Sequence, residues 1–509
     1  MRGDIPRPDI RRVLFLSAFV IAICGLVYEL VAGALASYLL GNGVTQWSLI
    51  IGTYMSAMGV GSLWSKAIER NLLARFVEIE LAVALIGGFE ASLLFAGFVY
   101  SESFKFLLFG LVATIGVLVG LELPLLIRIL ERETTLKELI ARILFLDYIG
   151  ALAASLAFPL LLLPKLGLIR TCLVFGLLNA LVALWTTFLF DAERPVLFRL
   201  RALCVATLVI LSAGLGGASV LETKMESDLF ADPVVFREHS AYQRIVVTHR
   251  DGDTRLFLDG ALQFSTIDEY RYHESLVHPA LASVAHPRRV LVLGGGDGLA
   301  VREVLRHDGV EEIVLVDLDP AMTRLFSERE GLAALNGEAL SDPRVTVVND
   351  DAFAWARSGG AGRFGAVVID FPDPNNYGLG KLYTNHFYRL LVPLLEPGAA
   401  VTIQATSPLW SPRAFWCIVR TLEHEGYTVR PYHAYVPSFG QWGFVLASQA
   451  PLPAFRPLPD GLRFLDDATL AGLFHFSPDI ARVDGPVNRL DNQALVRLYE
   501  QDWRTLDLK

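Results

Sequence analysis

The stretch Arg289-Val-Leu-Val-Leu-Gly-Gly-Gly-Asp-Gly298 decides the fold of the C-terminal half of this 509-residue chain. Within it, Val290–Leu293 is a short apolar run typical of a buried parallel strand. The glycines that follow let the backbone turn tightly and approach a ligand that a side chain would block. Leu299–His307 resumes helical spacing, so the sequence predicts strand, glycine loop and helix, the nucleotide-binding opening of a doubly wound sheet. Gly294 and Gly296 are therefore expected to lie against a bound nucleoside.

Further strands are predicted downstream, and acids stand where several of them end. The predicted strands are Glu312–Val316, Val345–Val348, Ala366–Ile369, Ala399–Gln404 and Trp442–Ala447. The carboxyl ends of parallel strands meet at one sheet edge, where open α/β sheets bind ligands. By position along the fold, Asp317 is predicted to bind ribose hydroxyls, Asp351 to lie near the adenine, and Asp370 and Asp373 to lie near the reacting end of the ligand. Any one of these acids would also suit a helix N-cap or a turn, so the prediction rests on the ordered set.

A small β subdomain is predicted ahead of this fold. Val234–Thr248 and Arg255–Leu258 alternate in strand fashion around Arg250-Asp-Gly-Asp253, a hairpin signal, and Asp268–Glu274 opens a helix. The predicted parts of the chain are a transmembrane domain (1–221), a linker with the β subdomain (222–288), a Rossmann-like domain (289–450) and a C-terminal extension (451–509).

The first part of the chain is dominated by long apolar runs. Seven of them approach or exceed the roughly 20 residues that cross a bilayer. They are Val13–Leu40, Trp47–Leu63, Phe76–Val99, Phe104–Leu130, Ile143–Leu163, Leu168–Phe190 and Ala202–Leu221. A cleaved signal peptide is a poor explanation for the first, because it is too long and more runs follow it. The sequence thus predicts an all-α transmembrane helix bundle in a lipid bilayer.

Basic residues collect in the loops on one side of these runs, which places the N-terminus in the cytoplasm. Seven spans would then place the C-terminal half outside. Four carboxylates fall within the runs: Glu29, Glu90, Glu122 and Asp147. They favour either a cation route or polyamine site inside the bundle, or simple pairing with buried polar groups.

Composition excludes other classes of protein. The formal net charge of −9, without a basic stripe, argues against a nucleic-acid partner. The four cysteines include no Cys-x-x-Cys pair, so neither a disulfide framework nor a zinc site is expected, and no metal site is predicted.

Several short motifs occur together in the C-terminal half and carry a family resemblance. They are Tyr242-Gln243, Leu258-Asp-Gly260 with Gln263, Tyr272-His-Glu274, Gly294-Gly-Gly-Asp-Gly298 and Asp370-x-x-Asp373-Pro374. From about Val234 to Ala447 the chain resembles the polyamine aminopropyltransferases of the spermidine synthase kind, with a class I methyltransferase-like fold. With the apolar half in front and the tail Val487-Asn-Arg-Leu-Asp-Asn492, the whole chain is similar to the membrane-anchored bacterial branch of that family.

The resemblance implies transfer of an aminopropyl group from decarboxylated S-adenosylmethionine to an amine such as putrescine, giving spermidine and methylthioadenosine. It implies no bound prosthetic group, a multi-pass protein of the bacterial inner membrane, and often a homodimer. Because that donor is a cytosolic metabolite, the side of the membrane that holds the catalytic half stays open.

The resemblance also implies roles for single residues. Asp370 matches the general base and Asp373 a ligand of the amine. The other matches are His273 and Asp297 at polyamine-contacting positions, Tyr272 and Gln263 in the substrate site, Gln243, Asp317, Asp351 and Ala352 at nucleoside-binding positions, and Tyr435 as candidate for an amine-contacting tyrosine.

Elementary chemistry agrees with these roles. An alkyl ammonium has a pKa near that of lysine, about 10.4, so the amine arrives protonated. Carboxylates can hold that cation and accept its proton as nitrogen attacks the carbon beside the sulfonium.

Two alternatives remain. A methyltransferase on the same fold would use the glycine loop and Asp317, but it does not require Tyr272-His-Glu274 or the Asp370/Asp373 pair. A membrane sensor or transporter would bind polyamine without turnover.

Overall fold

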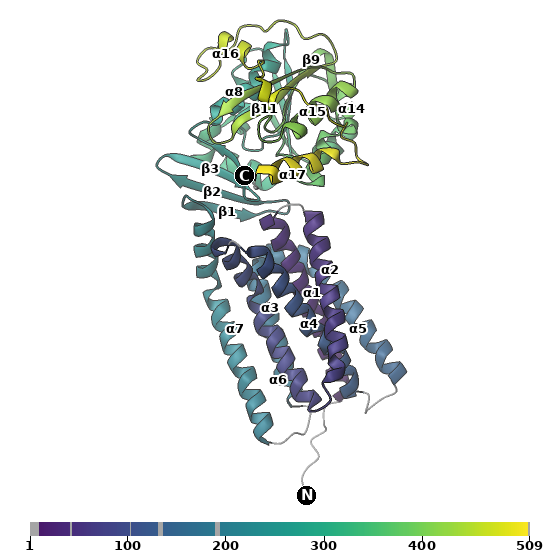
Figure 1. The fold of residues 1–509 in the computed structure, drawn as a ribbon. Helices are drawn as coiled ribbons and strands as arrows, with labels where there is room; N and C mark the ends of the chain where they lie inside the picture. The colour runs from purple at the N-terminus through teal and green to yellow at the C-terminus, as the bar shows by residue number, and fades with distance from the viewer. Residues whose placement is uncertain (1–9, 41–42, 102, 131–135, 189–193, 507–509) are drawn as a thin grey trace. The chain divides into compact units, whose positions relative to one another are not determined.

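The computed structural model describes residues 10–40, 43–101, 103–130, 136–188 and 194–506 (Figure 1). The chain divides into two compact units, Met1–Ala231 and Asp232–Lys509.

The first unit is a bundle of long helices. They are α1 (Ile10–Leu40), α2 (Gly43–Trp64), α3 (Leu72–Tyr100), α4 (Phe104–Leu130), α5 (Leu136–Ala157), α6 (Leu163–Thr186) and α7 (Arg194–Leu229). A π-helical turn, Phe158–Leu162, joins α5 to α6. The prediction of a helical N-terminal region is confirmed. The polar stretch that was expected to be a linker begins inside α7, which continues through Glu222 to Leu229.

Among the described residues, five helical segments are long and apolar enough to cross a membrane. They are Phe15–Leu40, Leu72–Tyr100, Phe104–Ile129, the α5–α6 run Lys137–Thr186, and Arg194–Glu222. The predicted second span lies in α2, which is outside this group; its apolar residues alternate with glycine, serine, threonine and glutamine.

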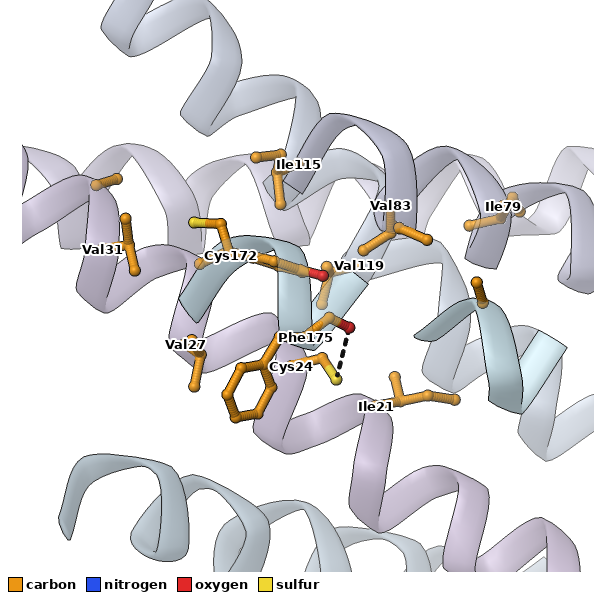
Figure 2. Close-up of a cluster of buried hydrophobic side chains, with 14 of the residues drawn as sticks. Ile21, Cys24, Val27, Val31, Ile79, Val83, Ile115, Val119, Cys172 and Phe175 are labelled. Carbon is orange, nitrogen blue, oxygen red and sulfur yellow. Dashed lines mark hydrogen bonds between the residues drawn. The ribbon is translucent and has the colours of Figure 1, made fainter. Parts of the chain in front are cut away.

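Close backbone contact holds part of the bundle together. A Cβ on Gly61 of α2 would lie 2.0 Å from the Val117 carbonyl oxygen of α4, and one on Gly120 would lie 2.2 Å from that of Met58. Small residues at such crossings are typical of helices packed in an apolar medium. Figure 2 shows the apolar core of the unit, where the Cys24 thiol donates to the Phe175 carbonyl at 3.7 Å.

The second unit opens with a four-stranded antiparallel sheet in the order β1-β2-β3-β4. Its strands are β1 (Val234–His239), β2 (Arg244–Arg250), β3 (Asp253–Leu258) and β4 (Ala261–Ser265). The predicted hairpin at Arg250–Asp253 is confirmed, since Asp251 and Gly252 turn the chain with φ of 52° and 85°. Two successive positive φ angles match the turn that suits the twist of a hairpin.

A seven-stranded mixed sheet follows, in the order β10-β11-β9-β8-β5-β6-β7. Its strands are β5 (Arg289–Gly294), β6 (Glu312–Asp317), β7 (Val345–Asn349), β8 (Phe364–Asp370), β9 (Leu395–Gln404), β10 (Thr428–Val436) and β11 (Gly440–Ser448). Strands β5 to β9 are parallel, and β11 runs antiparallel to β9. The predicted strands are thus confirmed, and β10 was not predicted.

Helices cover both faces of this sheet. They are α8 (Glu269–Ala282), α9 (Leu299–Leu305), α10 (Pro320–Glu328), α11 (Glu330–Ala333), α12 (Ala352–Arg357), α13 (Tyr377–Gly380), α14 (Asn385–Leu391), α15 (Pro412–His424), α16 (Asp467–Gly472) and α17 (Ala494–Leu506). Along β5, Val290 and Val292 join the core under α8 and α9, whereas Leu291 and Leu293 join the core under α12, α14 and α15. A strand buried on both faces explains the continuous apolar run in the sequence.

Candidate active site

The candidate site lies at the carboxyl ends of β5, β6 and β8, with α8 beside them. The glycine loop packs directly on the end of β8. A Cβ on Gly294, whose φ is 79°, would lie 2.2 Å from the Asp370 carbonyl oxygen. A Cβ on Gly296 would lie 2.7 Å from the carboxyl carbon of Asp317. The loop therefore needs glycine to bring the acids of two strands together.

Asp370 ends β8 and is bound by a residue of α8. The Tyr272 hydroxyl donates to Asp370 Oδ1 at 2.6 Å. Burial raises the pKa of Asp370 to about 6, against the lowering effects of the His273 charge and the Tyr272 hydrogen bond. Asp370 as a whole residue is only partly buried. A carboxylate with this pKa is ionised at neutral pH and can accept a proton.

His273, the next residue of α8, lies between acids. Its Nδ1 is 2.8 Å from Glu269 Oε2, and Arg302 binds Glu269 at 2.9 Å. Burial alone would lower the pKa of His273, but Glu269, with the charges of Asp297 and Asp370, raises it. Asp297 is 8% exposed and accepts the Leu299 N–H at 2.9 Å. The predicted residues His273, Asp297 and Asp370 thus lie close enough for their charges to interact.

Asp317 ends β6 and receives two backbone N–H groups, from Gly296 at 3.0 Å and Asp319 at 2.9 Å. Burial raises its pKa to about 6. Asp319 caps α10 and accepts Gln243 Nε2 at 3.0 Å and the Ser240 hydroxyl at 2.6 Å. Gln243, the residue before β2, is therefore linked to Asp317 through Asp319.

Asp373, three residues after Asp370, has three side-chain donors. The Tyr499 hydroxyl of α17 donates to Oδ2 at 2.8 Å, the Thr406 hydroxyl to Oδ2 at 3.3 Å, and Gln404 Nε2 to Oδ1 at 3.3 Å. Burial raises the pKa of Asp373 to about 6, and these hydrogen bonds oppose the rise. Thr406 has a φ of 60°, a strained conformation for a threonine that is often found at functional sites.

The C-terminal tail holds the segment beside Asp373. The side chain of Asn488 is 0% exposed and donates to the carbonyls of Gly380 and Tyr383, both at 3.1 Å. Its Oδ1 accepts the Leu495 N–H of α17 at 3.2 Å. The tail segment Val487–Asn492, which forms part of the family resemblance, therefore anchors α17, which carries Tyr499.

Asp351 is engaged by other groups. It caps α12 through the Phe353 N–H at 2.8 Å and pairs with Lys381 Nζ at 2.5 Å. Burial would raise its pKa, but Lys381 and the cap lower it overall. The N-cap role that residue type alone suggested is thus present, and its neighbour Ala352 begins α12 as a buried residue.

Two predicted residues make no hydrogen bond to the acids within the described part of the chain. Gln263 Nε2 donates to the Ala261 carbonyl, two residues away, at 3.1 Å. The Tyr435 side chain is 56% exposed on β10.

The residues that sequence reasoning missed are partners of the acids. Tyr499, Gln404, Thr406, Glu269, Arg302 and Asp319 fall in this group. Glu269 stands four residues before His273 on one helix face, a spacing that could have indicated the pair. Tyr499 is 126 residues from Asp373, and no local pattern reports such a contact.

The donor set of the site does not fit a metal centre. Among the residues that the structure describes, no group of three or more His, Cys, Asp or Glu side chains is arranged to hold a metal ion. Carboxylates with one neighbouring histidine suit an organic cation better.

Comparisons with known proteins agree on one family. The spermine/spermidine synthase domain family matches residues 269–456. The polyamine aminopropyltransferase of Leptospira interrogans is 50% identical over 97% of this chain and 99% of its own length. Polyamine aminopropyltransferase 2 of Ralstonia nicotianae is 51% identical over 96% of this chain and 98% of its own. Both relatives therefore cover the helical unit as well as the α/β unit.

Among solved structures, a spermidine synthase in complex with the transition-state analogue AdoDATO is similar. It is 25% identical and covers 48% of this chain and 85% of its own, with a TM-score of 0.45.

Proposed function

Because this chain belongs to the polyamine aminopropyltransferase family, we propose that its amine acceptor is putrescine and that Asp370 is the general base. The chain transfers an aminopropyl group from decarboxylated S-adenosylmethionine to an amine. With putrescine as acceptor, the products are spermidine and methylthioadenosine.

The reaction needs one bond exchange and one proton transfer. The amine nitrogen attacks the carbon beside the sulfonium, the carbon–sulfur bond breaks, and its electron pair leaves with the neutral thioether. The ammonium must lose a proton before or during attack, and Asp370 accepts it. The 2.6 Å hydrogen bond from Tyr272 keeps Oδ1 occupied and so orients Oδ2 for this task. Positioning of the two substrates supplies much of the remaining acceleration.

Asp373 and Asp297 have the charge to hold the cationic ends of the substrates. Asp373 would bind the acceptor ammonium, and Asp297 the bare ammonium of the decarboxylated donor. Asp317 would bind the ribose hydroxyls and Gln243 another part of the nucleoside, and their link through Asp319 supports this assignment.

The observation that carries this proposal is the pair of acids at the end of β8, both with a pKa near 6. Its test is an assay of the detergent-purified full chain with decarboxylated S-adenosylmethionine and a panel of amines, following methylthioadenosine. We expect turnover with putrescine above all other amines. Turnover with a different amine and none with putrescine would refute putrescine as the acceptor. Nucleoside binding without turnover of any amine would favour the membrane sensor.

Activity should be lost in mild acid. Burial places the pKa of both Asp370 and Asp373 at about 6, and both must be ionised to take a proton and to hold a cation. We expect kcat/KM for the amine to fall as the pH drops through 6, with a slope approaching two protons. The free energy of unfolding should change in the opposite direction. Carboxyl groups with a raised pKa in the folded state bind protons more readily there, so protonation stabilises the fold as the pH falls. A flat kcat/KM between pH 7 and 5 would exclude both assignments.

Tyr499→Phe should weaken amine binding selectively. The variant removes the shortest hydrogen bond to Asp373 while it keeps the ring, and a hydrogen bond to a charged group contributes about 1.5–3 kcal/mol. We expect KM for the amine to rise roughly tenfold, with KM for the donor unchanged, and the acid limb of the profile to move to higher pH because Tyr499 lowers the pKa of Asp373.

Tyr388→Phe is the matched control, since Tyr388 is fully buried and its hydroxyl has no hydrogen-bond partner among the described residues. Equal kinetics for the two variants would show that the Tyr499 hydroxyl has only a structural role.

We further infer that the helical unit crosses the bacterial inner membrane, with the N-terminus in the cytoplasm. The five apolar helical segments and the basic bias of the loops support this. Retention of the chain in the membrane pellet after carbonate extraction tests it, and release into the supernatant would refute it. A phosphatase or green fluorescent protein fused after Lys509 reports the side of the α/β unit.

A further inference from the structure

Three glutamates lie in the interior of the helical unit. Glu80 and Glu90 of α3 are 0% and 1% exposed, and Glu122 of α4 is 1% exposed. Among the described residues, no lysine, arginine or histidine forms an ion pair with any of them. A buried carboxylate without a partner is strongly destabilising, so each of these groups must either be protonated or have its charge compensated by a cation.

Glu80 and Glu122 form a pair. Their carboxyl groups lie close enough to interact directly with each other. Yet none of their four oxygens receives a hydrogen bond from a donor in the described part of the chain. One shared proton would give this pair a single hydrogen bond and leave the other lone pairs unused.

A third polar side chain lies at the level of this pair. A Cβ on Gly176 of α6 would lie 2.7 Å from the Ala84 carbonyl oxygen of α3 and 3.0 Å from the Gly88 Cα. Asn179 is three residues beyond Gly176, and Glu80 is four residues before Ala84. Since residues three or four apart share a helix face, both side chains lie on the faces that meet at this crossing.

The two helices run antiparallel there, because Gly88 also approaches Cys172, four residues before Gly176. From Gly176 onward α6 therefore runs toward the start of α3, so Asn179 lies toward the level of Glu80. Asn179 is 1% exposed, and neither its Oδ1 nor its Nδ2 has a hydrogen-bond partner among the described residues. An unsatisfied amide at such depth is unusual, and its two polar atoms can serve a bound group.

A buried hydroxyl of α1 adds to this arrangement. Tyr28 is 0% exposed, and its ring lies 2.7 Å from the position of a Cβ on Gly87. Its hydroxyl has no partner in the described structure and lies within range of the charges of both Glu90 and Glu122. Buried polar groups thus come from four helices, α1, α3, α4 and α6. The core around Cys24, Val83 and Val119 is apolar (Figure 2).

A cation from outside the described residues would supply hydrogen-bond donors to these groups and compensate the charge of the carboxylates. The nearest candidate in the sequence, Arg128 of α4, donates instead to the carbonyls of Ser65 and Ile68, at 3.0 and 2.8 Å. A metal ion is a poor match, because the described His, Cys, Asp and Glu side chains form no group of three suited to one. A primary ammonium carries one positive charge and three N–H donors, which suits two carboxylates and an amide oxygen.

We propose that Glu80, Glu122 and Asn179 bind the ammonium end of an alkyl amine inside the helical unit. This site is separate from the acids at the end of β8 and does not rest on their role in catalysis. Its ligand belongs to the chemical class of the acceptor and product of the α/β unit, so one chain would bind amines in two places.

The test measures the stoichiometry of amine binding by the full chain in detergent micelles. Radiolabelled putrescine and spermidine are used in equilibrium dialysis without the aminopropyl donor. We expect two amines per chain for the unaltered protein and one for Glu80→Gln/Glu122→Gln, with methylthioadenosine release retained in that variant. The matched control is Glu78→Gln, two residues away on α3, where the carboxylate is partly exposed and pairs with Arg75 and Arg199.

Other outcomes would overturn the proposal. Equal stoichiometry in the double variant and the Glu78→Gln control would mean that the pair only shares a proton. Displacement of the second amine by equimolar sodium or potassium would mean an inorganic cation site.

If the double variant fails to fold, Asn179→Leu keeps the side-chain volume and removes the amide. We expect this variant to bind the second amine at least fivefold more weakly while it elutes as the same single species. Unchanged affinity would exclude Asn179 from the site and refute the assignment.

Discussion

Asp370→Asn should reduce kcat by about 100- to 10,000-fold, the contribution typical of a positioned general base. The variant keeps the shape of the side chain and an oxygen that can accept the Tyr272 hydroxyl, but it has no lone pair basic enough to take the proton of an ammonium. The glycine loop and Asp317 are untouched, so binding of decarboxylated S-adenosylmethionine should remain. Stopped-flow or single-turnover release of methylthioadenosine, with equilibrium binding of the nucleoside, measures both.

Asp350→Asn is the matched control at the same sheet edge. The exposed side chain of Asp350 accepts the Asp351 N–H at 2.8 Å, a contact that an asparagine oxygen can replace. We expect its kcat to stay within twofold of the unaltered enzyme. Near-normal turnover in Asp370→Asn would assign the base to another group, and Asp373 would be the next candidate.

Gly294→Ala should abolish most of the activity for a different reason. The added Cβ would lie 2.2 Å from the Asp370 carbonyl oxygen, and the residue would have to keep a φ of 79°. The left-handed conformation alone costs an L-residue about 1–2 kcal/mol. Since the contact is with backbone, β5 or the end of β8 must move, and a shift of about 1 Å in a reacting group can lower the rate about 100-fold. We expect a fall of at least that size in kcat/KM.

Gly331→Ala separates this effect from a general loss of stability. Gly331 lies in α11 with nothing within 4 Å of its added Cβ, so alanine should be tolerated or slightly stabilising. Thermal unfolding of both variants, beside their kinetics, completes the comparison. Full activity in Gly294→Ala would mean that the loop can move away from β8 without consequence for the base.

Local pattern predicted the elements that place the site, since each depends on adjacent residues. Val290–Leu293 is apolar throughout because β5 is buried on both faces, and the glycines stand where β5 ends against β8. Asp317, Asp370 and Asp373 follow strands, so the parallel topology brings them to one edge. Strand β10 escaped prediction because Pro431 interrupts it, and the structure shows why proline is tolerated: β10 is the edge strand of the sheet.

What the sequence did not predict depends on contacts between distant residues or on helix register. Tyr499 and Thr406 reach Asp373 only through the packing of α17 and the loop after β9. Glu80 was overlooked because Glu78 and Glu80 together resemble the polar start of a span. Helical register separates them: Glu78 pairs with surface arginines, whereas Glu80 is turned into the core.

The tail contact of Asp373 has a practical consequence for fragments of this enzyme. A recombinant piece that ends at Arg456, where the matched synthase domain ends, would contain the proposed base Asp370, the glycine loop and Asp317. It would nevertheless lack Tyr499, whose hydroxyl binds Asp373. It would also lack Asn488, whose amide binds the carbonyls of Gly380 and Tyr383. Such a piece should retain its nucleoside and lose its acceptor, and a separate peptide spanning 485–506 should complement it in trans.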